Sequence, residues 1–280
     1  MIKSRLFLCV LCALCGKTPV RAEAPHTIRV ITYNIHHGEG TDGKIDLERI
    51  AKVLLAESPD VVALNEVDQG TQRTNRIDMP AELARLTGMT AVFEKNIDFE
   101  GGKYGNAVLT RLPIVRHENH KLPSHYEGEQ RGVLEVELGV DAKSSNDASG
   151  KVKKAGSVLF FATHLDYRPE DHERMASVAR IKEILGQRTN QPAILAGDLN
   201  AAADSAVMAA FAKNWKRTNA EVLPTYPAAE PNNQIDYILV RPADQWNVME
   251  VRVLDEAVAS DHRGLLAVLR RKPTPESTAK

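Results

Sequence analysis

The sequence predicts one α/β domain in which two β-sheets pack together and helices cover their outer faces. Nine short apolar runs, many of them rich in Val and Ile, have the composition of strands. Between several of them, apolar residues recur at helical spacing. Nine strands are too many for a simple doubly wound sheet, so an arrangement of two packed sheets fits this number better. The 280 residues, 43% hydrophobic and 26% charged, have the size and composition of a globular protein.

The expected strands are short and end at turn-forming or polar residues. In chain order they are Ile28–Asn34, Val61–Glu66, Ala107–Arg111, Val133–Val140, Val158–His164, Ala193–Asp198, Ile235–Val240, Val248–Leu254 and Leu265–Leu269.

Four helices are expected between these strands. In Asp46–Ser58 the apolar residues recur at i, i+3, i+4, i+7 and i+8, Asp46 can cap the first turn, and Pro59 ends the helix. The other three are expected at Pro80–Leu86, Pro169–Leu185 and Ser205–Phe211.

The first 24 residues are typical of an export signal. Basic residues precede the apolar stretch Leu6–Cys15, and Ala22-Glu23-Ala24 offers a small-residue cleavage site near residues 22–24. All three cysteines lie inside that apolar stretch. We therefore predict a periplasmic or extracellular protein that has no thiol after cleavage. No apolar run is long enough for a transmembrane anchor.

A single domain is expected over residues 27–271. Residues 141–154 are polar and charged and predict an exposed loop, and residues 272–280 predict a disordered tail. Without residues 1–24 the chain has 32 Lys and Arg against 36 Asp and Glu, and no basic cluster suggests a nucleic-acid track. We expect a monomer.

Polar residues follow four of the apolar runs. Asn34, the pair Asn65-Glu66, His164 and the segment Asp198-Leu199-Asn200 each stand where a predicted strand ends. A single Asn or Asp is an ordinary turn former, but Glu and His are poor ones. If the strands are neighbours, these side chains surround one crevice, which is where α/β sheets bind ligands.

Two later segments add ionisable groups. Asp236 stands among apolar residues, where an unpaired charge would be costly, and Asp261 and His262 are adjacent before the last strand. A hydrogen bond between an Asp and a His would offset the cost of burial and orient the imidazole, as hydrolytic sites require.

These segments carry a specific resemblance. In order, TYNIHHG, NEVD, THLD, GDLN, IDYIL and SDHRG resemble the motif series of the endonuclease/exonuclease/phosphatase superfamily, and the match extends from Asn34 to His262. The resemblance implies a four-layer α/β sandwich, two packed mixed sheets flanked by helices, with the site at one edge of the sheets.

The same resemblance implies roles for individual residues. Glu66 would be the principal metal ligand, with Asn34 beside it and Asp261 near the ion. Asp198 would orient or deprotonate the attacking water, and Asn200 would position the phosphate. Asp236 would pair with His262, which would stabilise the transition state or act as base. His164 would bind a phosphoryl oxygen or assist the leaving group. The resemblance leaves open whether Asp198 or His262 takes the proton.

Two further residues are placed less firmly by the motifs. Tyr104 falls near the position of a Tyr or Glu that supports the catalytic histidine in relatives, a position that Lys103 or Asn106 could also occupy. Arg131 is placed to bind phosphate, although a surface arginine would look the same in the sequence.

The donor atoms favour a hard cation. Carboxylate and amide oxygens, without cysteine or a histidine cluster, suit Mg²⁺ or Mn²⁺ better than zinc. His36 and His37 are adjacent on a segment expected to be extended, where they would point to opposite sides, so no histidine metal site is expected.

The sequence thus predicts a secreted Mg²⁺- or Mn²⁺-dependent hydrolase that cleaves a phosphodiester or phosphomonoester by attack of water. The first alternative is a DNA or RNA nuclease of the same superfamily. It is not favoured, because the chain has few aromatic residues (5%) for base stacking and no basic track. The second is a non-catalytic binding protein that keeps the fold, which the complete set of polar site residues disfavours.

Overall fold

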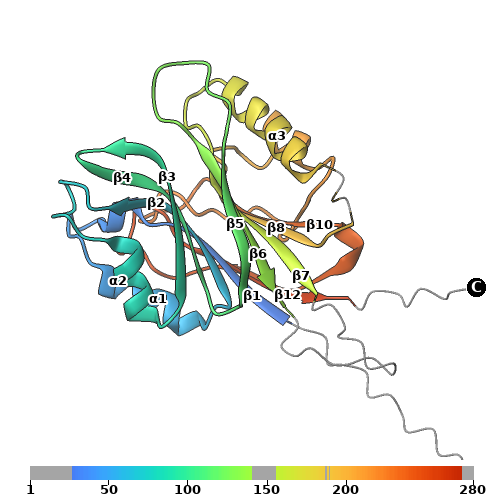
Figure 1. Ribbon diagram of the computed structural model, residues 1–280. Helices are drawn as coiled ribbons and strands as arrows, with labels where there is room; N and C mark the ends of the chain where they lie inside the picture. Colours follow the sequence, from blue (N-terminus) through green and yellow to red (C-terminus); the bar gives the residue numbers. More distant parts are fainter. Residues whose placement is uncertain (1–26, 141–155, 187, 189, 273–280) are drawn as a thin grey trace, which may run out of the picture.

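A computed structural model describes residues 27–140, 156–186, 188 and 190–272. Two mixed β-sheets of six strands each stack face to face, with helices on both outer faces (Figure 1). The predicted fold class, an α/β sandwich of four layers, is confirmed. The predicted signal at residues 1–24, the loop at 141–154 and most of the tail at 272–280 lie outside the described residues.

The first sheet combines strands from both ends of the chain. Its order is β11 (Trp246–Val253), β12 (Leu265–Arg271), β1 (Thr27–Asn34), β2 (Val61–Gln69), β4 (Gly102–Thr110) and β3 (Thr90–Phe99). The second sheet is built from the middle of the chain. Its order is β5 (Ile114–Lys121), β6 (Gly132–Gly139), β7 (Ser157–His164), β8 (Ala193–Asp198), β10 (Asp236–Arg241) and β9 (Lys216–Arg217).

Each sheet has one parallel pair at its centre, β1 with β2 and β7 with β8, and its other pairs are antiparallel. Because the strands of a parallel pair run in the same direction, their carboxyl ends meet at one edge of the sheet. This is the edge at which the polar endings of the sequence gather.

The central strands are apolar along their length because both faces are covered. Successive side chains of β1 point to opposite faces of the sheet. Val30 packs between the two sheets, whereas Ile31 packs under the helices α1 (Leu47–Glu57) and α2 (Met79–Thr87). On the second sheet Phe160 of β7 faces the first sheet, and Phe161 packs under α3 (His172–Leu185) and α4 (Ala206–Phe211). Two short 3₁₀ turns, η1 (His36–Gly38) and η2 (Ala243–Gln245), complete the elements.

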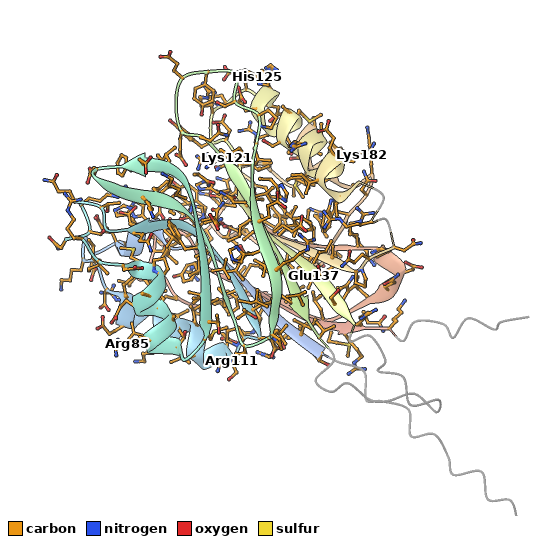
Figure 2. All side chains as sticks on the ribbon, viewed as in Figure 1. Arg85, Arg111, Lys121, His125, Glu137 and Lys182 are labelled. Atoms are coloured by element: carbon orange, nitrogen blue, oxygen red, sulfur yellow. The ribbon has the colours of Figure 1, made fainter. Side chains whose placement is uncertain are left out.

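The outer faces of the helices are charged, as their amphipathic patterns require. Arg85 on α2 and Lys182 on α3 are exposed and point away from the sheets (Figure 2). Among the described residues, no helix is long and apolar enough to cross a membrane.

Nine strands and four helices lie where the sequence predicts them, and three strands do not appear in that prediction. β3 and β5 are edge strands with charged, half-exposed sequences, and β9 has two residues. An edge strand needs no continuous apolar run because only part of it is buried. α3 begins three residues later than predicted, at His172.

Candidate functional site

The register of the strand pairs in the second sheet brings three predicted site residues together. In the parallel pair β7/β8, His164 stands opposite Asp198, and in the antiparallel pair β8/β10, Asp198 stands opposite Asp236. All three are buried. The carboxyl ends of β7 and β8 therefore meet the beginning of β10, and one histidine and two carboxylates occupy a single row across three strands.

Gly197 permits this close row. A Cβ atom at Gly197 would lie 1.8 Å from the carbonyl oxygen of Thr163 on the neighbouring strand, so no larger side chain fits without moving the backbone. The glycine of the GDLN segment thus sets the spacing between His164 and Asp198.

Asp198 lies at the centre of the buried group. Its Oδ2 accepts a hydrogen bond from Asn34 Nδ2 (3.2 Å) and lies 3.5 Å from His164 Nε2 and 3.8 Å from His262 Nε2. Its Oδ1 accepts from the backbone N–H of Asn200 (2.9 Å). Burial, together with the nearby Asp236 carboxylate, raises the pKa of Asp198 to about 7.

Asp236 and His262 form the predicted pair. His262 Nδ1 donates to Asp236 Oδ2 at 2.9 Å. Burial alone would lower the pKa of His262, but the charge and hydrogen bond of Asp236, with the charge of Asp198, raise it to about 10. His262 is therefore an imidazolium at neutral pH. Thr225 Oγ1 also donates to Asp236 Oδ2 (2.7 Å) and fixes the carboxylate from behind.

His164 has the opposite electrostatic character. Burial and the positive charges of Arg131 and His262 hold its pKa well below the usual range, so its imidazole is neutral. Asn200 Nδ2 lies 3.1 Å from His164 Nε2 and donates to the carbonyl oxygen of Leu165 (3.1 Å). Asn200 therefore ties the end of β8 to the end of β7.

The first sheet contributes Asn34 and Glu66. Asn34 Nδ2 donates to Glu66 Oε1 (2.9 Å) as well as to Asp198, so one amide joins carboxylates of the two sheets. Asn34 Oδ1 accepts from the backbone N–H of His36 (3.0 Å).

Glu66 does not end its strand, contrary to the prediction. β2 continues to Gln69, and the register with β4 shifts between Leu64 and Val67. Glu66 has a positive φ of 58° at this irregularity. A β-bulge re-aims the side chain without ending the strand, and such bulges occur often beside active sites.

The prediction that His36 and His37 lie on an extended segment and point to opposite sides is also wrong. Both residues have positive φ, 44° and 43°, and lie in the turn η1, so the segment is not extended. Their rings contact each other, with centroids 4.4 Å apart. The alternation of side chains along a strand does not apply in a turn, and the two imidazoles lie on the same side as Glu66.

The remaining predicted residues lie around this centre. Asp261 is half-buried and its Oδ1 accepts from Ser260 Oγ (3.3 Å). Arg131 is buried and ion-paired with Glu129, and its charge acts on His164. Tyr104 is buried beside Arg73, whose guanidinium lies 5.4 Å from the ring centroid. Within the described part of the chain, Tyr104 makes no hydrogen bond to either site histidine.

Sequence reasoning gave no role to Asn65, a buried residue that links the two sheets at the site. It is fully buried; its Oδ1 accepts from the backbone N–H of Asp198 (2.9 Å), and its Nδ2 donates to Asn106 Oδ1 (2.9 Å) and to the Thr163 carbonyl (3.0 Å). Asn65 thereby fastens the first sheet to both central strands of the second. The sequence did offer a sign of its importance, because Asn65 stands next to Glu66 where the strand was expected to end. Only the carboxylate of that pair was given a role.

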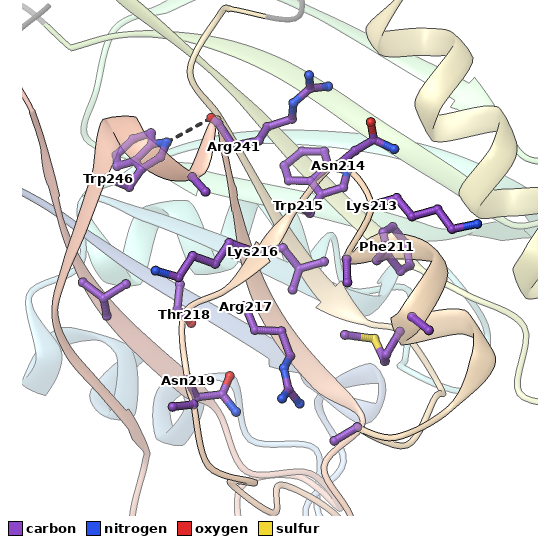
Figure 3. A pocket seen from close by; sticks show the side chains of 18 of the residues that line it. Phe211, Lys213, Asn214, Trp215, Lys216, Arg217, Thr218, Asn219, Arg241 and Trp246 are labelled. Carbon is purple, nitrogen blue, oxygen red and sulfur yellow. Dashed lines mark hydrogen bonds between the residues drawn. The ribbon is translucent and has the colours of Figure 1, made fainter.

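A cavity of about 1170 Å³ lies elsewhere in the molecule (Figure 3). It is bordered by α4, β9 and β11, and its labelled side chains include Trp215, Arg217 and Trp246. None of the predicted site residues lines it. This cavity therefore does not mark the predicted chemistry, whose residues form the buried polar row at the sheet edge.

Comparison with known proteins identifies the family of this chain. The sequence model of the endonuclease/exonuclease/phosphatase family matches residues 31–262, which span the site from β1 to His262. The chain belongs to this family. Members of the endonuclease/exonuclease/phosphatase family are hydrolases that act on phosphate esters.

Three similar proteins are as follows. "Uncharacterized protein YbhP" of Escherichia coli (strain K12) is 26% identical over 256 residues, which cover 86% of this chain and 95% of that protein. A family structure from Beutenbergia cavernae DSM 12333 has 26% identity and a TM-score of 0.69, covering 90% of this chain and 73% of that one. The mannosyl-6-phosphatase of Bacteroides thetaiotaomicron VPI-5482 has 19% identity and a TM-score of 0.67, covering 86% and 99%.

The family's use of divalent metals can be tested against the donor atoms. Two groups have ligand atoms within 4.8 Å of one another: His36, His37 and Glu66, and Asp198, Asp236 and His262. In the second group the proton held between Asp236 and His262 already balances one negative charge. The carboxylate of Glu66 has no such internal proton and is the better candidate for a cation ligand.

Proposed function

We propose that this protein is an exported, Mg²⁺- or Mn²⁺-dependent phosphoesterase that hydrolyses a phosphomonoester or phosphodiester by attack of water. The observation that carries the proposal is the buried row in which Asp198 lies between two histidines, with Asp236 behind one of them. Family membership supports the reaction class.

Asp198 is the group that takes a proton from water. A general base works best when its pKa lies near the operating pH, and the pKa of Asp198 is raised to about 7. Its Oδ1 is held by the Asn200 backbone and its Oδ2 by Asn34, so the carboxylate is fixed in orientation.

His262 acts as a positive charge instead of a base. With a pKa raised to about 10 it keeps its proton at neutral pH, and Asp236 holds its ring through Nδ1. The Nε2–H is left for negative charge that develops on a phosphoryl oxygen. The motifs leave the base open between Asp198 and His262, and we propose Asp198 on the strength of these two opposite pKa shifts.

Neutral His164 serves the other side of the phosphate. Its neutral ring adds no second positive charge beside His262, and its Nε2 accepts a hydrogen bond from Asn200 Nδ2, so the proton lies on Nδ1 and the ring orients Asn200 beside the phosphate. Asn200 holds this ring at 3.1 Å. Arg131 supplies the nearby positive charge expected of a phosphate-binding residue.

Asn34, Glu66 and Asp261 would hold the divalent cation. Their oxygens are the donors that Mg²⁺ and Mn²⁺ prefer. When bound, such an ion neutralises phosphate charge and stabilises the leaving oxygen. We further propose that the protein acts as a monomer.

A panel of substrates tests the reaction. Plasmid DNA, RNA, sphingomyelin, inositol phosphates, sugar phosphates and bis-p-nitrophenyl phosphate are incubated with the protein and Mg²⁺, Mn²⁺ or EDTA. Asp198→Asn is the inactive partner, and Asp244→Asn, at an exposed position of η2, is the matched control. We expect cation-dependent release of phosphate or alcohol that Asp198→Asn abolishes. Undiminished turnover in excess EDTA would refute the metal requirement.

Export has a separate test. The chain is expressed with its native first 24 residues, and the protein recovered outside the cytoplasm is sequenced from its N-terminus. We expect a start near Glu23 or Pro25. Recovery of only full-length protein from the cytoplasm would reject the localisation.

A further inference from the structure

His36, His37 and Glu66 form a compact group on the first-sheet side of the site. Each presents one ligand atom, and the three atoms lie within 4.8 Å of one another. Bonds of about 2.0–2.2 Å from zinc to nitrogen and oxygen place neighbouring ligand atoms closer than this, so small side-chain rotations would bring all three onto one ion. The roles proposed above for the phosphoesterase centre do not use the two imidazoles.

Glu39 engages one nitrogen of each imidazole. His36 Nδ1 lies 3.3 Å from the Glu39 carbonyl oxygen, and His37 Nε2 lies 3.4 Å from the Glu39 carboxylate. Histidines that bind metals typically donate their other ring N–H to a carboxylate or a backbone carbonyl, which fixes the tautomer and the ring. One residue supplies both kinds of partner here.

The opposite atoms are free to receive a ligand. His37 is 9% exposed, and its buried Nδ1 has no hydrogen-bond partner. Glu66 uses Oε1 to accept from Asn34, and in the described chain its second oxygen accepts no hydrogen bond. A buried polar atom without a partner is rare in native proteins and is satisfied when it binds an ion.

We propose that His36, His37 and Glu66 form a binding site for one transition-metal ion of the Zn²⁺ or Co²⁺ type, with Glu39 as the residue that orients both imidazoles. Imidazole nitrogens select such ions over Mg²⁺. Glu66 belongs to this site and also to the site of the proposed hydrolase cation. The inference rests on the proposed function only through this shared residue.

Cobalt reports the ligands directly, because the d–d absorption of Co²⁺ changes with the type and number of donor atoms. The full chain is used with Cys9, Cys12 and Cys15 replaced by Ser, since thiolates would also bind the ion. After treatment with EDTA and removal of the chelator, Co²⁺ is titrated in a large excess of Mg²⁺. His36→Gln and His37→Gln are compared with His172→Gln, a control from another pair of histidines, whose rings stack at 4.5 Å.

The protein that keeps both His36 and His37 should bind one Co²⁺ per chain even in the large excess of Mg²⁺. Each of the two substitutions should weaken Co²⁺ binding by more than the roughly 10- to 100-fold that loss of an outer partner causes. Glu39→Gln should weaken it within that range, and His172→Gln should leave it unchanged. Equal Co²⁺ affinity and spectra in all variants would overturn the proposal.

Two outcomes separate this inference from the proposed hydrolase. Histidine-dependent Co²⁺ binding without turnover of any phosphate ester would reject the hydrolase alone. Turnover with Mg²⁺ and histidine-independent Co²⁺ binding would reject the transition-metal site alone. If the His37 variant fails to fold, X-ray absorption of the zinc-loaded protein decides: scattering from two imidazoles is expected, and a spectrum of oxygen ligands only would overturn the site.

Discussion

The two sheets furnish the site with acids of different character. Glu66 of the first sheet is half-buried, stands at a bulge and has one hydrogen-bonded oxygen. Asp198 and Asp236 of the second sheet are buried and bonded to amide, hydroxyl, backbone or imidazole groups. A carboxylate that binds an ion, the role proposed for Glu66, must keep an oxygen free and accessible, whereas burial raises the pKa of Asp198, the proposed base. The sandwich places one kind on each layer.

The sharpest test of this division is Asp198→Asn. Loss of an acid–base group typically lowers kcat by roughly 10²- to 10⁴-fold, and we expect a loss in that range. Stability should not fall, because the raised pKa of Asp198 means that its buried charge opposes folding above about pH 7. Kinetics and a thermal melt at pH 8 on the same sample check both effects. A collapse of the melting temperature with normal kcat would show that Asp198 is structural.

The coupling of Asp236 and His262 is tested by a double-mutant cycle. His262→Ala should lower kcat by roughly 10²-fold or more, and Asp236→Asn nearly as much, because the imidazolium loses the partner that orients and charges it. The double variant should be little worse than His262→Ala alone, since groups that act as a unit give non-additive losses. If Asp236 serves only to hold Thr225, Asp236→Asn will lower the melting temperature and leave kcat nearly intact.

The activity of a variant at Glu66, the carboxylate of the first sheet, should depend on metal concentration. Glu66→Gln keeps the size of the side chain but removes the charge that attracts a cation. We expect a weaker apparent affinity for Mg²⁺ or Mn²⁺, and an activity loss that excess metal partly restores. Titration of activity with metal measures this, with Asp198→Asn as the comparison that metal should not rescue. Rescue of both variants, or of neither, would break the distinction between the sheets.

The smallest expected effect is the pH dependence of stability. The pKa of His262 is raised in the folded protein to about 10 from an ordinary value of 6.5. Its protonation therefore stabilises the fold fully below pH 6.5, and this contribution is lost as the pH rises towards 10. The free energy of unfolding should fall more steeply between pH 7 and 10 in the unmodified protein than in His262→Ala. Parallel curves would mean that the imidazole is not held protonated.

The sequence predicts elements best where both faces are buried. β1, β7 and β8 follow directly from their apolar runs, and their polar last residues lie in the site. The edge strands β3 and β5 escape prediction because their exposed positions carry charged residues such as Glu94 and Arg116. These two strands form because they pair with neighbouring strands, and the local sequence contains no pattern that predicts such pairing.

The sequence predicted which residues lie in the site better than it predicted the backbone conformation there. The motifs named Asp198, Asp236 and His262, and the structure brings them together. The bulge at Glu66 and the positive φ values of His36 and His37 could not be predicted, since all three residues ordinarily avoid that conformation. Asn65 was overlooked because its bonds join three elements distant in sequence.

The pairing of β1 with β12 has a consequence for attachments to this molecule. Thr27 stands opposite Arg270, so the described ends of the chain are neighbours. Asn34 lies at the other end of the same strand, and seven steps at about 3.3 Å per residue separate it from Thr27 by roughly 23 Å. A tether or fusion partner attached directly at Thr27 or Arg270 would therefore begin at the end of the sheet opposite Asn34. A molecule immobilised by its ends would turn its reactive edge towards the surrounding medium.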